Sequence, residues 1–465
     1  MSRAEAVAAA QRTLEDGSLL AALSRRIACP TASQDPASEP HLWRYLEQEI
    51  APDLERVGFT CSIHPNPTGK GGPFLIGRRI EDAGLPTLLT YGHGDTVLGL
   101  DAEWEEGLAP WRITQRGDRL YGRGIVDNKG QHTLNLAALE AVLKTRGHLG
   151  FNVTVLIEMS EEVGSPGIDE FARAHRAELA ADVLIASDGP RLVPDVPAIV
   201  LGTRGALSMD LRVRYREGGH HSGNWGGLLA NPGVRLAHAI ASIIDRDGRV
   251  LVRDLVPERI PNSVRAALGQ CRVDGGADGP AIDAWWGEPG LTAAEKVFGW
   301  NTFEVLAFKT GHPEAPVNAV PPEAFARCQI RYTVDRAPAT FIPAIRRHLA
   351  EAGFDDVTVE PVKAGAEWAA TRMDPDGPWP RLVAASIERS LGKAPMIVPN
   401  AGGSLPNDTF AVTLGLPTLY IPHSYSGCSQ HAPNEHALLP IMREALAIAA
   451  GVFWDLGEQP WPGRA

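Results

Sequence analysis

Two stretches of the chain alternate short apolar runs with helical patterns, and a long middle stretch of different character separates them. The first, over residues 75–199, contains the apolar runs PTLLTY, FNVTVLIEM and ADVLIAS around the helical pattern NKGQHTLNLAALEAVLKT. The second contains a helical pattern over 379–391, an apolar run over 417–421 and a final helical pattern over 438–452. Strands that alternate with helices are typical of a sheet covered by helices. We therefore predict an α/β fold for both stretches.

The middle stretch, which begins near residue 204, has the pattern of a separate domain. It contains the alternating run ALSMDLRVRY, a glycine-rich loop over 218–227 and an apolar-periodic helix over 234–244. Strand candidates over 303–307 and 324–334 and a helix over 339–351 follow, and residues 274–290 have the pattern of an irregular loop. We predict that residues 204–363 form an inserted α+β domain, and that residues 1–203 and 364–465 form one split α/β domain around a mixed sheet.

Five side chains of metal-binding type occur in the outer stretches, each near a predicted strand end, helix start or loop. In chain order they are His93 in YGHGDT, Asp127 in GRGIVDNKG, Glu162 in MSEEVGS, Asp188 in SDGP and His431 in QHAPNEH. Open α/β sheets bind ligands at the carboxyl ends of their strands. Because His431 belongs to the last stretch and the others to the first, the outer stretches must fold together to use the whole set.

This set has the composition that a centre for two metal ions requires. Such a centre needs one carboxylate shared by two cations about 3.5–4 Å apart, one His and one further carboxylate for each cation, and a free carboxylate as base. Glu161 can be that base, because adjacent residues on an extended segment point in opposite directions and Glu162 can then bind metal. Asp95 can accept the second N–H of His93 and so orient its ring.

Each residue alone also has a simpler interpretation. A His after a strand is usually a turn or core residue, Asp127 can cap the helix that follows it, and the adjacent glutamates can form a solvated turn. Asp188 can form a turn before a Gly-Pro pair, and His436 competes with His431 as a ligand. Only the ordered set is specific to a metal centre.

Other functions lack support in the sequence. No GxSxG elbow, P-loop or HExxH motif occurs, and GGHHSGNWGG lacks the strand–turn–helix setting of a dinucleotide site. The net charge of −12 argues against a nucleic-acid partner. No apolar run approaches the ~18 residues of a membrane span. The five scattered cysteines are typical of reduced thiols, so we expect a cytoplasmic protein without a membrane partner.

Seven motifs in this chain, taken in order, resemble those of one enzyme family. They are YGHGD, LYGRGIVDNKG, EMSEEVGS, HHSGNWGGLLANP, NAVPPEAFARCQIR, GGSLPND and HAPNEH. Over nearly its whole length the chain is similar to the dinuclear zinc metallopeptidases, which include carnosinase-type dipeptidases, carboxypeptidase G and aminoacylases. The resemblance implies a catalytic domain interrupted by a lid domain that makes a homodimer. It also implies two divalent metal ions per subunit, zinc first, with cobalt or manganese as alternatives.

The resemblance also assigns roles to the metal ligands, position by position. It implies that Asp127 bridges the two metals. Glu162 and His431 would complete one site, and His93 and Asp188 would complete the other.

Further roles follow from the same resemblance. Glu161 would be the general base, Asp95 would support His93, and His221 would reach the active site of a neighbouring subunit. The residues that match substrate-contacting positions are Asn318, Arg331 and Ser404. Of these, Arg331 would be the clamp for a substrate carboxylate. The sequence departs from the carnosinase-like pattern at Asn318, which stands where Thr is usual, and in reading GGSLP for GGSIP.

The expected reaction is hydrolysis of an amide bond in a small substrate with a free carboxylate, such as a dipeptide, with Glu161 moving the proton. One alternative is an N-acyl-amino-acid amidohydrolase or a related hydrolase of C–N bonds in a non-peptide substrate. Another is a non-catalytic, metal-binding dimeric scaffold.

Overall fold

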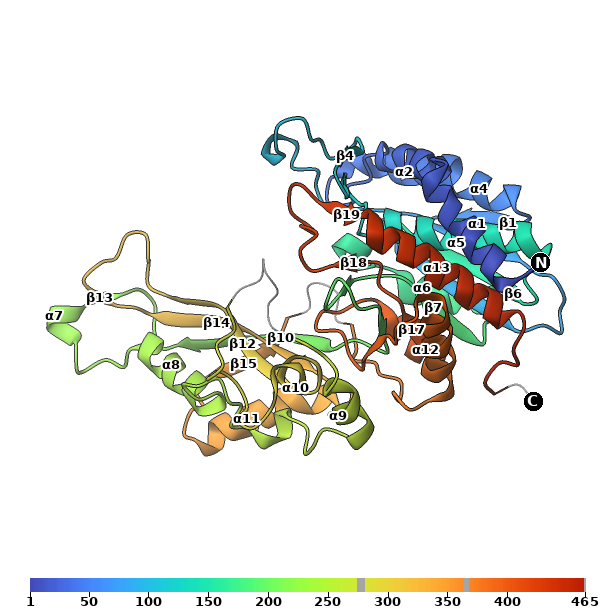
Figure 1. Ribbon diagram of the computed structural model, residues 1–465. Helices are drawn as coiled ribbons and strands as arrows, with labels where there is room; N and C mark the ends of the chain where they lie inside the picture. The colour runs from blue at the N-terminus through green and yellow to red at the C-terminus, as the bar shows by residue number, and fades with distance from the viewer. Residues whose placement is uncertain (274–280, 363–367, 464–465) are drawn as a thin grey trace.

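The computed structural model describes residues 1–273, 281–362 and 368–463, which form two lobes (Figure 1). The large lobe is built on an eight-stranded sheet and contains the helices nearest to both ends of the chain. The small lobe is built on a four-stranded sheet whose strands all lie between Gly205 and Pro361.

The large sheet takes strands from both outer stretches of the chain, in the order β1-β2-β6-β3-β7-β17-β9-β16. The strands are β1 (Thr60–His64), β2 (Phe74–Arg79), β3 (Thr87–His93), β6 (Asn152–Glu158), β7 (Val183–Ala186), β9 (Ala198–Val200), β16 (Met396–Val398) and β17 (Thr418–Tyr420). Strands β6, β3, β7 and β17 run parallel to one another. Strand β2 runs antiparallel to both of its neighbours, β1 and β6. Because β17 pairs with β7 and β16 with β9, the two outer stretches form one mixed sheet, as predicted.

Helices cover both faces of the large sheet. Side chains along each strand alternate between the faces, so one strand contributes residues to the core on each side. Val153, Val155 and Ile157 of β6 belong to the core of one face, and Leu156 belongs with Phe171 to the core of the other. The helices with buried residues in the first core are α1 (Arg3–Glu15), α2 (Ser18–Ile27), α3 (Glu39–Arg44), α4 (Ala51–Arg56), α5 (Lys129–Arg146), α12 (Pro378–Leu391) and α13 (Leu439–Leu456). Phe171 belongs to α6 (Ile168–Ala174). The apolar patterns of the sequence predict α5, α12 and α13 but none of α1 to α4.

The small lobe has one packed face and one polar face. Its sheet has the order β12-β14-β10-β15, with all pairs antiparallel. The strands are β10 (Gly205–Arg214), β12 (Thr302–Thr310), β14 (Glu323–Tyr332) and β15 (Thr358–Pro361), and the helices are α8 (Pro232–Ile243), α9 (Asn262–Leu268), α10 (Ala293–Phe298) and α11 (Phe341–Glu351). Met209, Leu211 and Val213 of β10 are buried in the core that includes α8 and α11. On the other face Arg327 pairs with Asp210 at 2.9 Å.

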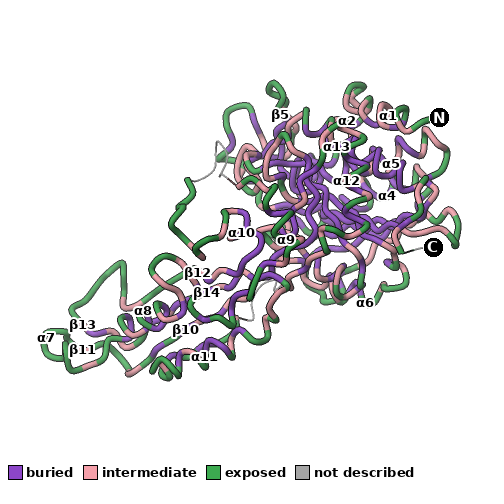
Figure 2. Tube along the Cα trace, turned by 60° about the horizontal axis from the view of Figure 1, so that its bottom comes forward, coloured by how far each residue is buried: buried purple, intermediate pink, exposed green. Residues whose placement is uncertain are grey.

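The outer end of the small lobe, hereafter the tip, carries β11 (His220–His221), α7 (Ser222–Trp225) and β13 (Ala319–Val320). The glycine-rich segment predicted as a loop therefore contains a short strand and a helical turn, because β11 pairs with β13. The tip lies far from the large lobe (Figure 1). Figure 2 shows that the tip is largely exposed, whereas the strands of the large lobe are buried.

Short strands pair with one another within the loops of the large lobe. One group consists of β4 (Thr114–Arg116), β5 (Arg119–Tyr121) and β19 (His436–Leu438), and a second of β8 (Pro190–Arg191) and β18 (Ser424–Tyr425). The irregular loop predicted over 274–290 lies outside the described residues as far as 280, and residues 281–290 contain no helix or strand. Among the described residues, none of the helices combines the length and the apolar character that a membrane span requires.

Candidate metal centre

Three parallel strands bring predicted ligands to one edge of the large sheet. His93 is the last residue of β3, Asp188 follows the end of β7, and Glu162 follows β6 in the 3-10 turn η4 (Glu161–Val163). Because β3 lies between β6 and β7 and runs parallel to both, the carboxyl ends of these strands meet at the same edge. The location is the one that the sequence predicts.

Asp127 lies between the two predicted histidine ligands and presents one carboxylate oxygen to each. Its Oδ1 is 3.0 Å from His93 Nε2, and its Oδ2 is 2.8 Å from His431 Nε2. The remaining carboxylates divide between the histidines: Asp188 Oδ2 is 3.9 Å from His93 Nε2, and Glu162 Oε2 is 3.1 Å from His431 Nε2. Two groups of possible metal ligands result, and Asp127 belongs to both.

These two groups are His93–Asp127–Asp188 and Asp127–Glu162–His431, and the ligand atoms within each lie within 4.8 Å of one another. A His and a carboxylate on each side of a shared carboxylate is the arrangement of a centre for two metal ions. The structure thus brings together all five predicted ligands.

Glu161 and Glu162 diverge, but for a different reason from the one expected. From the sequence we expect an extended segment, whereas η4 is a 3-10 turn. Glu161 Oε2 lies 3.9 Å from His93 Nε2, while Glu162 points to His431. The backbone N–H groups of both glutamates donate to the Asp95 carboxylate at 3.1 Å. Tertiary hydrogen bonds to Asp95 therefore hold this turn.

Asp95 also lies beside His93, as the sequence predicts. Its Oδ1 is 3.4 Å from His93 Nδ1, and its backbone carbonyl is 3.1 Å from the same nitrogen. A group that accepts the Nδ1 proton leaves Nε2 free for a metal and fixes the ring orientation. Asp95 is fully buried, so it connects the His93 ring and the glutamate turn within the protein interior.

The interpretation of Asp127 as a helix cap is wrong. Helix α5 begins at Lys129 and its N-cap position is Asn128, without a side-chain capping bond. The side chain of Asn128 instead donates to the Ser187 carbonyl at 2.8 Å. Both oxygens of Asp127 face the histidines, and Gln430 Nε2 donates to Oδ2 at 2.5 Å. Asp127 is therefore oriented by the site and not by helix capping.

His431 and not His436 belongs to the centre. His436 is buried in β19, with Nε2 2.7 Å from the Tyr425 hydroxyl and Nδ1 2.9 Å from the Asn434 carbonyl. Both of its ring nitrogens are thus engaged away from the carboxylates. His431 is about half exposed, in contrast to the fully buried His93, so one side of the centre is open to solvent.

The electrostatics of the site favour bound cations. Burial raises the pKa of Glu162 to about 7 and that of Asp188 to about 6, and in both cases Asp127 adds to the effect. Burial opposes a charge on His93, but its hydrogen bonds to Asp127 and Asp95 outweigh that and raise the pKa of His93 well above its ordinary value. The buried Oδ2 of Asp188 has no hydrogen-bond partner. Carboxylates that crowd together in this way fit two divalent cations.

The remaining four predicted residues, besides Glu161 and Asp95, form two separate pairs. Arg331 Nη1 donates to Ser404 Oγ at 3.0 Å, which joins β14 of the small lobe to the loop after β16. At the tip, His221 pairs with Ala319, and the Asn318 carbonyl accepts from Ser222 N at 2.8 Å. His221 and Asn318 are both exposed and belong to the tip, whose elements α7 and β13 lie far from the large lobe (Figure 1).

Glu435 is a site residue that the sequence analysis missed. Its carboxylate accepts from the backbone of Gly124 and Val126 at 3.0 Å and from Arg123 Nη1 at 2.8 Å. It therefore ties the loop of His431 to the loop of Asp127. The signal was present in HAPNEH, where an acid follows His431 by four residues, but its partners are more than 300 residues away.

The chain belongs to peptidase family M20/M25/M40, whose pattern matches residues 89–455. It is 26% identical over 432 residues to a cysteinylglycine-S-conjugate dipeptidase from Corynebacterium striatum, over 87% of this chain and 88% of that protein. The protein is thus an enzyme, a metal-dependent hydrolase of peptide bonds in small substrates.

Solved structures share this fold. A metallo-carboxypeptidase of the M20 family from Sulfolobus solfataricus superposes with a TM-score of 0.76 at 24% identity, over 95% of this chain and 99% of that one. A dinuclear metal-binding peptidase of the M20 family from Bacillus subtilis superposes with a TM-score of 0.56 at 12% identity, over 95% and 96%. The mixed sheet with an additional small lobe is therefore the fold of this family.

Proposed function

We propose that this enzyme cleaves the peptide bond of a dipeptide or of another short peptide with a free terminal carboxylate, at a centre of two divalent cations. The observation that carries the proposal is the position of Asp127, whose two oxygens face two different histidines, each with a further carboxylate of its own. His93 and Asp188 would hold one cation, and Glu162 and His431 the other, with Asp127 shared.

Glu161 is the general base in this proposal. It lies beside the His93 group but belongs to neither set of possible ligands, so its carboxylate is available to a proton. Burial raises its pKa well above the ordinary value for Glu; His93 opposes this shift, and the carboxylates Asp188 and Asp127 add to it. A raised pKa makes the carboxylate a stronger base. Bound cations would polarise the substrate carbonyl and make a water more acidic. Glu161 accepts a proton as that water attacks the carbonyl carbon, and delivers it to the amine nitrogen as the C–N bond breaks.

Zinc is the proposed native metal. Two imidazoles together with several carboxylates form a mixed nitrogen and oxygen ligand set, which zinc accepts readily. Cobalt or manganese could occupy the same set and support activity. The test is metal analysis of protein after chelation and reconstitution, and the proposal requires close to two ions per chain.

Arg331 is the proposed recognition group for the substrate carboxylate. A guanidinium forms two parallel hydrogen bonds with a carboxylate, and Arg331 already donates one bond to Ser404 on the neighbouring loop. Ser404 Oγ in turn donates to the Arg204 carbonyl at 2.8 Å, which fixes the hydroxyl between the two arginines. Such a clamp would make the enzyme recognise the C-terminal carboxylate of its substrate.

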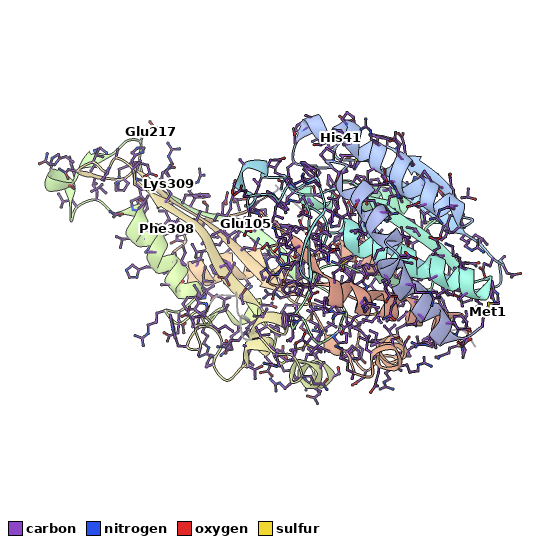
Figure 3. All side chains as sticks on the ribbon, turned by 45° about the horizontal axis from the view of Figure 1, so that its top comes forward. Met1, His41, Glu105, Glu217, Phe308 and Lys309 are labelled. Carbon is purple, nitrogen blue, oxygen red and sulfur yellow. The ribbon has the colours of Figure 1, made fainter. Side chains whose placement is uncertain are left out.

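The small lobe, residues 204–363, is the proposed inserted lid domain, and we propose that it also forms a homodimer. Strand β12 lies at the edge of the small sheet and exposes the apolar side chains of Val305, Leu306 and Phe308. Figure 3 shows Phe308 and Lys309 on the small lobe, on the side away from Met1. An open apolar edge strand is a template for pairing with a second chain. A dimer formed there would allow His221 and Asn318 of one tip to serve the centre of the other subunit.

A cytoplasmic location is also proposed, on the basis of the cysteines. All five are unpaired, and the buried Cys328 and Cys428 have raised thiol pKa values because of burial. Unpaired thiols of this kind are typical of reducing compartments.

A hydrolysis screen tests the proposed reaction directly. Zinc-loaded protein would be assayed against dipeptides, against the same dipeptides as C-terminal amides, and against N-acyl amino acids. Turnover of the free dipeptides, lost on chelation and restored by zinc, is the expected result. Turnover of N-acyl amino acids alone would instead assign the enzyme to the amidohydrolases.

The dimer has a separate test in the edge strand. Leu306→Lys places a charge on β12 at a position that is 56% exposed, so it should not disturb the fold. We expect sedimentation velocity to show a dimer for the wild type and a monomer for the variant. Lys309→Glu is a control on the same strand that removes no apolar surface. A wild-type monomer at micromolar concentration would contradict the proposal.

A further inference from the structure

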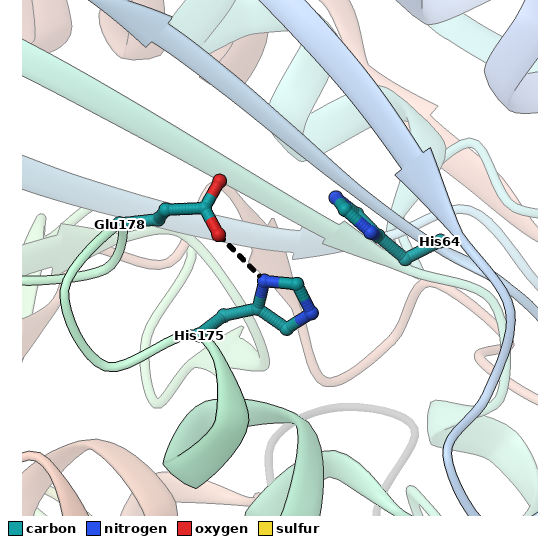
Figure 4. A group of neighbouring side chains, drawn as sticks. All are labelled: His64, His175 and Glu178. Carbon is teal, nitrogen blue, oxygen red and sulfur yellow. Dashed lines mark hydrogen bonds and ion pairs between the residues drawn. The ribbon is translucent and has the colours of Figure 1, made fainter.

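A second cluster of metal-binding side chains lies at the outer edge of the large sheet. It consists of His64 at the end of β1, His175 at the C-cap of α6, and Glu178 in the loop that follows (Figure 4). Each side chain offers one ligand atom, and these atoms lie within 4.8 Å of one another. None of the three belongs to the centre around Asp127, and none is part of a motif that the function uses.

Two contacts already orient the cluster. His175 Nδ1 is 2.7 Å from Glu178 Oε1, and His64 Nε2 is 2.8 Å from Ser62 Oγ. When His64 Nε2 donates its proton to the serine, Nδ1 keeps the lone pair that a metal needs. Burial and the neighbouring His175 lower the pKa of His64, which favours the neutral ring that a metal needs.

The cluster has the accessibility of a cation site. The side chains of His175 and Glu178 are 21% and 40% exposed, so water can complete the coordination. Zinc holds nitrogen and oxygen ligands at about 2.0–2.2 Å, which puts neighbouring ligand atoms roughly 3.3 Å apart. Because the three ligand atoms already lie within 4.8 Å of one another, small side-chain rotations would bring them to that spacing. Glu178 follows α6 in a loop, where such movement is easiest.

The cluster is separate from the main centre. The register of β3, β6, β2 and β1 aligns His93 with Glu158, Phe74 and His64 in turn. Three strand spacings of about 4.8 Å put His64 roughly 14 Å from His93 across the sheet. We propose that His64, His175 and Glu178 bind an additional divalent cation of the zinc type. Such an ion would link the edge strand β1 to the C-terminal end of α6.

The competing interpretation is that the three side chains serve packing alone. His175 stacks on Phe171 with ring centroids 4.3 Å apart, and Phe171 stacks on Phe74 at 4.2 Å. In that case His175 and Glu178 form only a hydrogen-bonded pair at the surface. The two interpretations differ in the number of metal ions that the chain binds, and this number does not depend on catalysis.

The test counts zinc per chain in the full-length protein. Chelated wild type and the variants Glu178→Gln and His64→Gln would be dialysed against a range of free zinc concentrations, and bound zinc measured by mass spectrometry. We expect each variant to bind one zinc fewer than the wild type and to keep the wild-type kcat. His148→Gln, which removes an exposed His elsewhere in the large lobe, should bind as much zinc as the wild type.

Thermal unfolding gives a second readout. Zinc added beyond the main centre's requirement should raise the melting temperature of the wild type and of His148→Gln, but not of the two cluster variants. Equal zinc content in the wild type and both cluster variants would overturn the proposal. Loss of the extra zinc in only one variant would also overturn it, because a shared site needs both ligands.

Discussion

The metal-ligand cluster and the tip of the small lobe carry the residues assigned to one reaction, yet they are built in opposite ways. At the sheet edge, His93 and Asp95 are fully buried, and hydrogen bonds to Asp95 hold the backbone of Glu161 and Glu162. At the tip, His221 and Asn318 are exposed, and β11 and β13 pair over only two residues. Contacts within the same chain hold the first group in place, whereas the side chains of the second group are not buried against other residues of the chain.

This difference indicates what each region requires. Buried ligands fixed by hydrogen bonds can bind cations without a conformational change, so the large lobe should hold metal on its own. An exposed pair far from the ligands can act on a substrate only if another surface comes to it. The contrast therefore favours a composite site, in which the sheet edge supplies the chemistry and a partner's tip completes it.

Replacing the proposed base should separate chemistry from metal binding. Glu161→Gln keeps the size of the side chain but cannot accept a proton, so kcat should fall by about 10²- to 10⁴-fold. Metal content should stay at the wild-type value, because Glu161 is in neither ligand group. Glu162→Gln is the matched control on the adjacent residue and should lose metal. A near-normal kcat in Glu161→Gln would show that another group is the base.

The tip should act on the other subunit. His221→Ala should lower kcat by about 10²- to 10³-fold if its ring stabilises charge on the carbonyl oxygen. We then expect activity to return when inactive His221→Ala protein is mixed with inactive Glu161→Gln protein and the subunits exchange. One site of each mixed dimer would contain both lesions and the other neither. A mixture that stays inactive after verified exchange would place His221 at its own subunit's centre.

The junction between the lobes should set the preference for a free carboxylate. Arg331→Ala should reduce kcat/KM for a dipeptide acid by about 10- to 100-fold, the worth of a charged hydrogen bond, while the C-terminal amide should lose much less. Arg327→Ala is a control on the same face of β14, where Arg327 is paired with Asp210. An enzyme that cleaves acid and amide equally well from the start would exclude the clamp.

The sequence predicts the sheet edge better than the tip for a physical reason. The ends of β3, β6 and β7 can be located from local apolar runs, and parallel strands must bring those ends together. The approach of His221 to Asn318 depends on the pairing of β11 with β13, which are nearly 100 residues apart, and no local pattern marks it. Likewise, the turn at Glu161 depends on Asp95, so a local reading expects an extended segment.

Helix α1 illustrates a different limit. Its fully buried residues are only Ala6 and Ala10, so it lacks the large buried apolar side chains that mark α5 and α13. The clearest signal is the capping box of Ser2 and Glu5, which marks a helix start but not what the helix packs on. Contacts with α5 and α13 position α1, and both of those helices are distant from it in the sequence.

A buried His of the large lobe, His423, has surroundings opposite to those of the exposed His221. His423 is buried, its Nδ1 has no hydrogen-bond partner, and burial followed by the nearby Arg191 lowers its pKa to about 3. The unfolded chain has an ordinary His pKa near 6.5. Between pH 6.5 and 3 the unfolded state therefore binds a proton that the folded state does not. The contribution of His423 to stability is present above pH 6.5 and is lost as the pH falls toward 3.

We expect His423→Gln to flatten the acid side of the stability profile by about one proton, or about 1.4 kcal/mol per pH unit at most. The measurement is the urea midpoint of wild type and variant at pH 7 and pH 5, since the difference between the proteins cancels the other titrating groups. His221→Gln is the control, because it makes the same substitution at an exposed ring of the tip. A wild type and a His423→Gln variant that lose equal stability between pH 7 and pH 5 would mean that His423 takes up its proton without unfolding. The buried and exposed histidines would then not differ in the way that their surroundings predict.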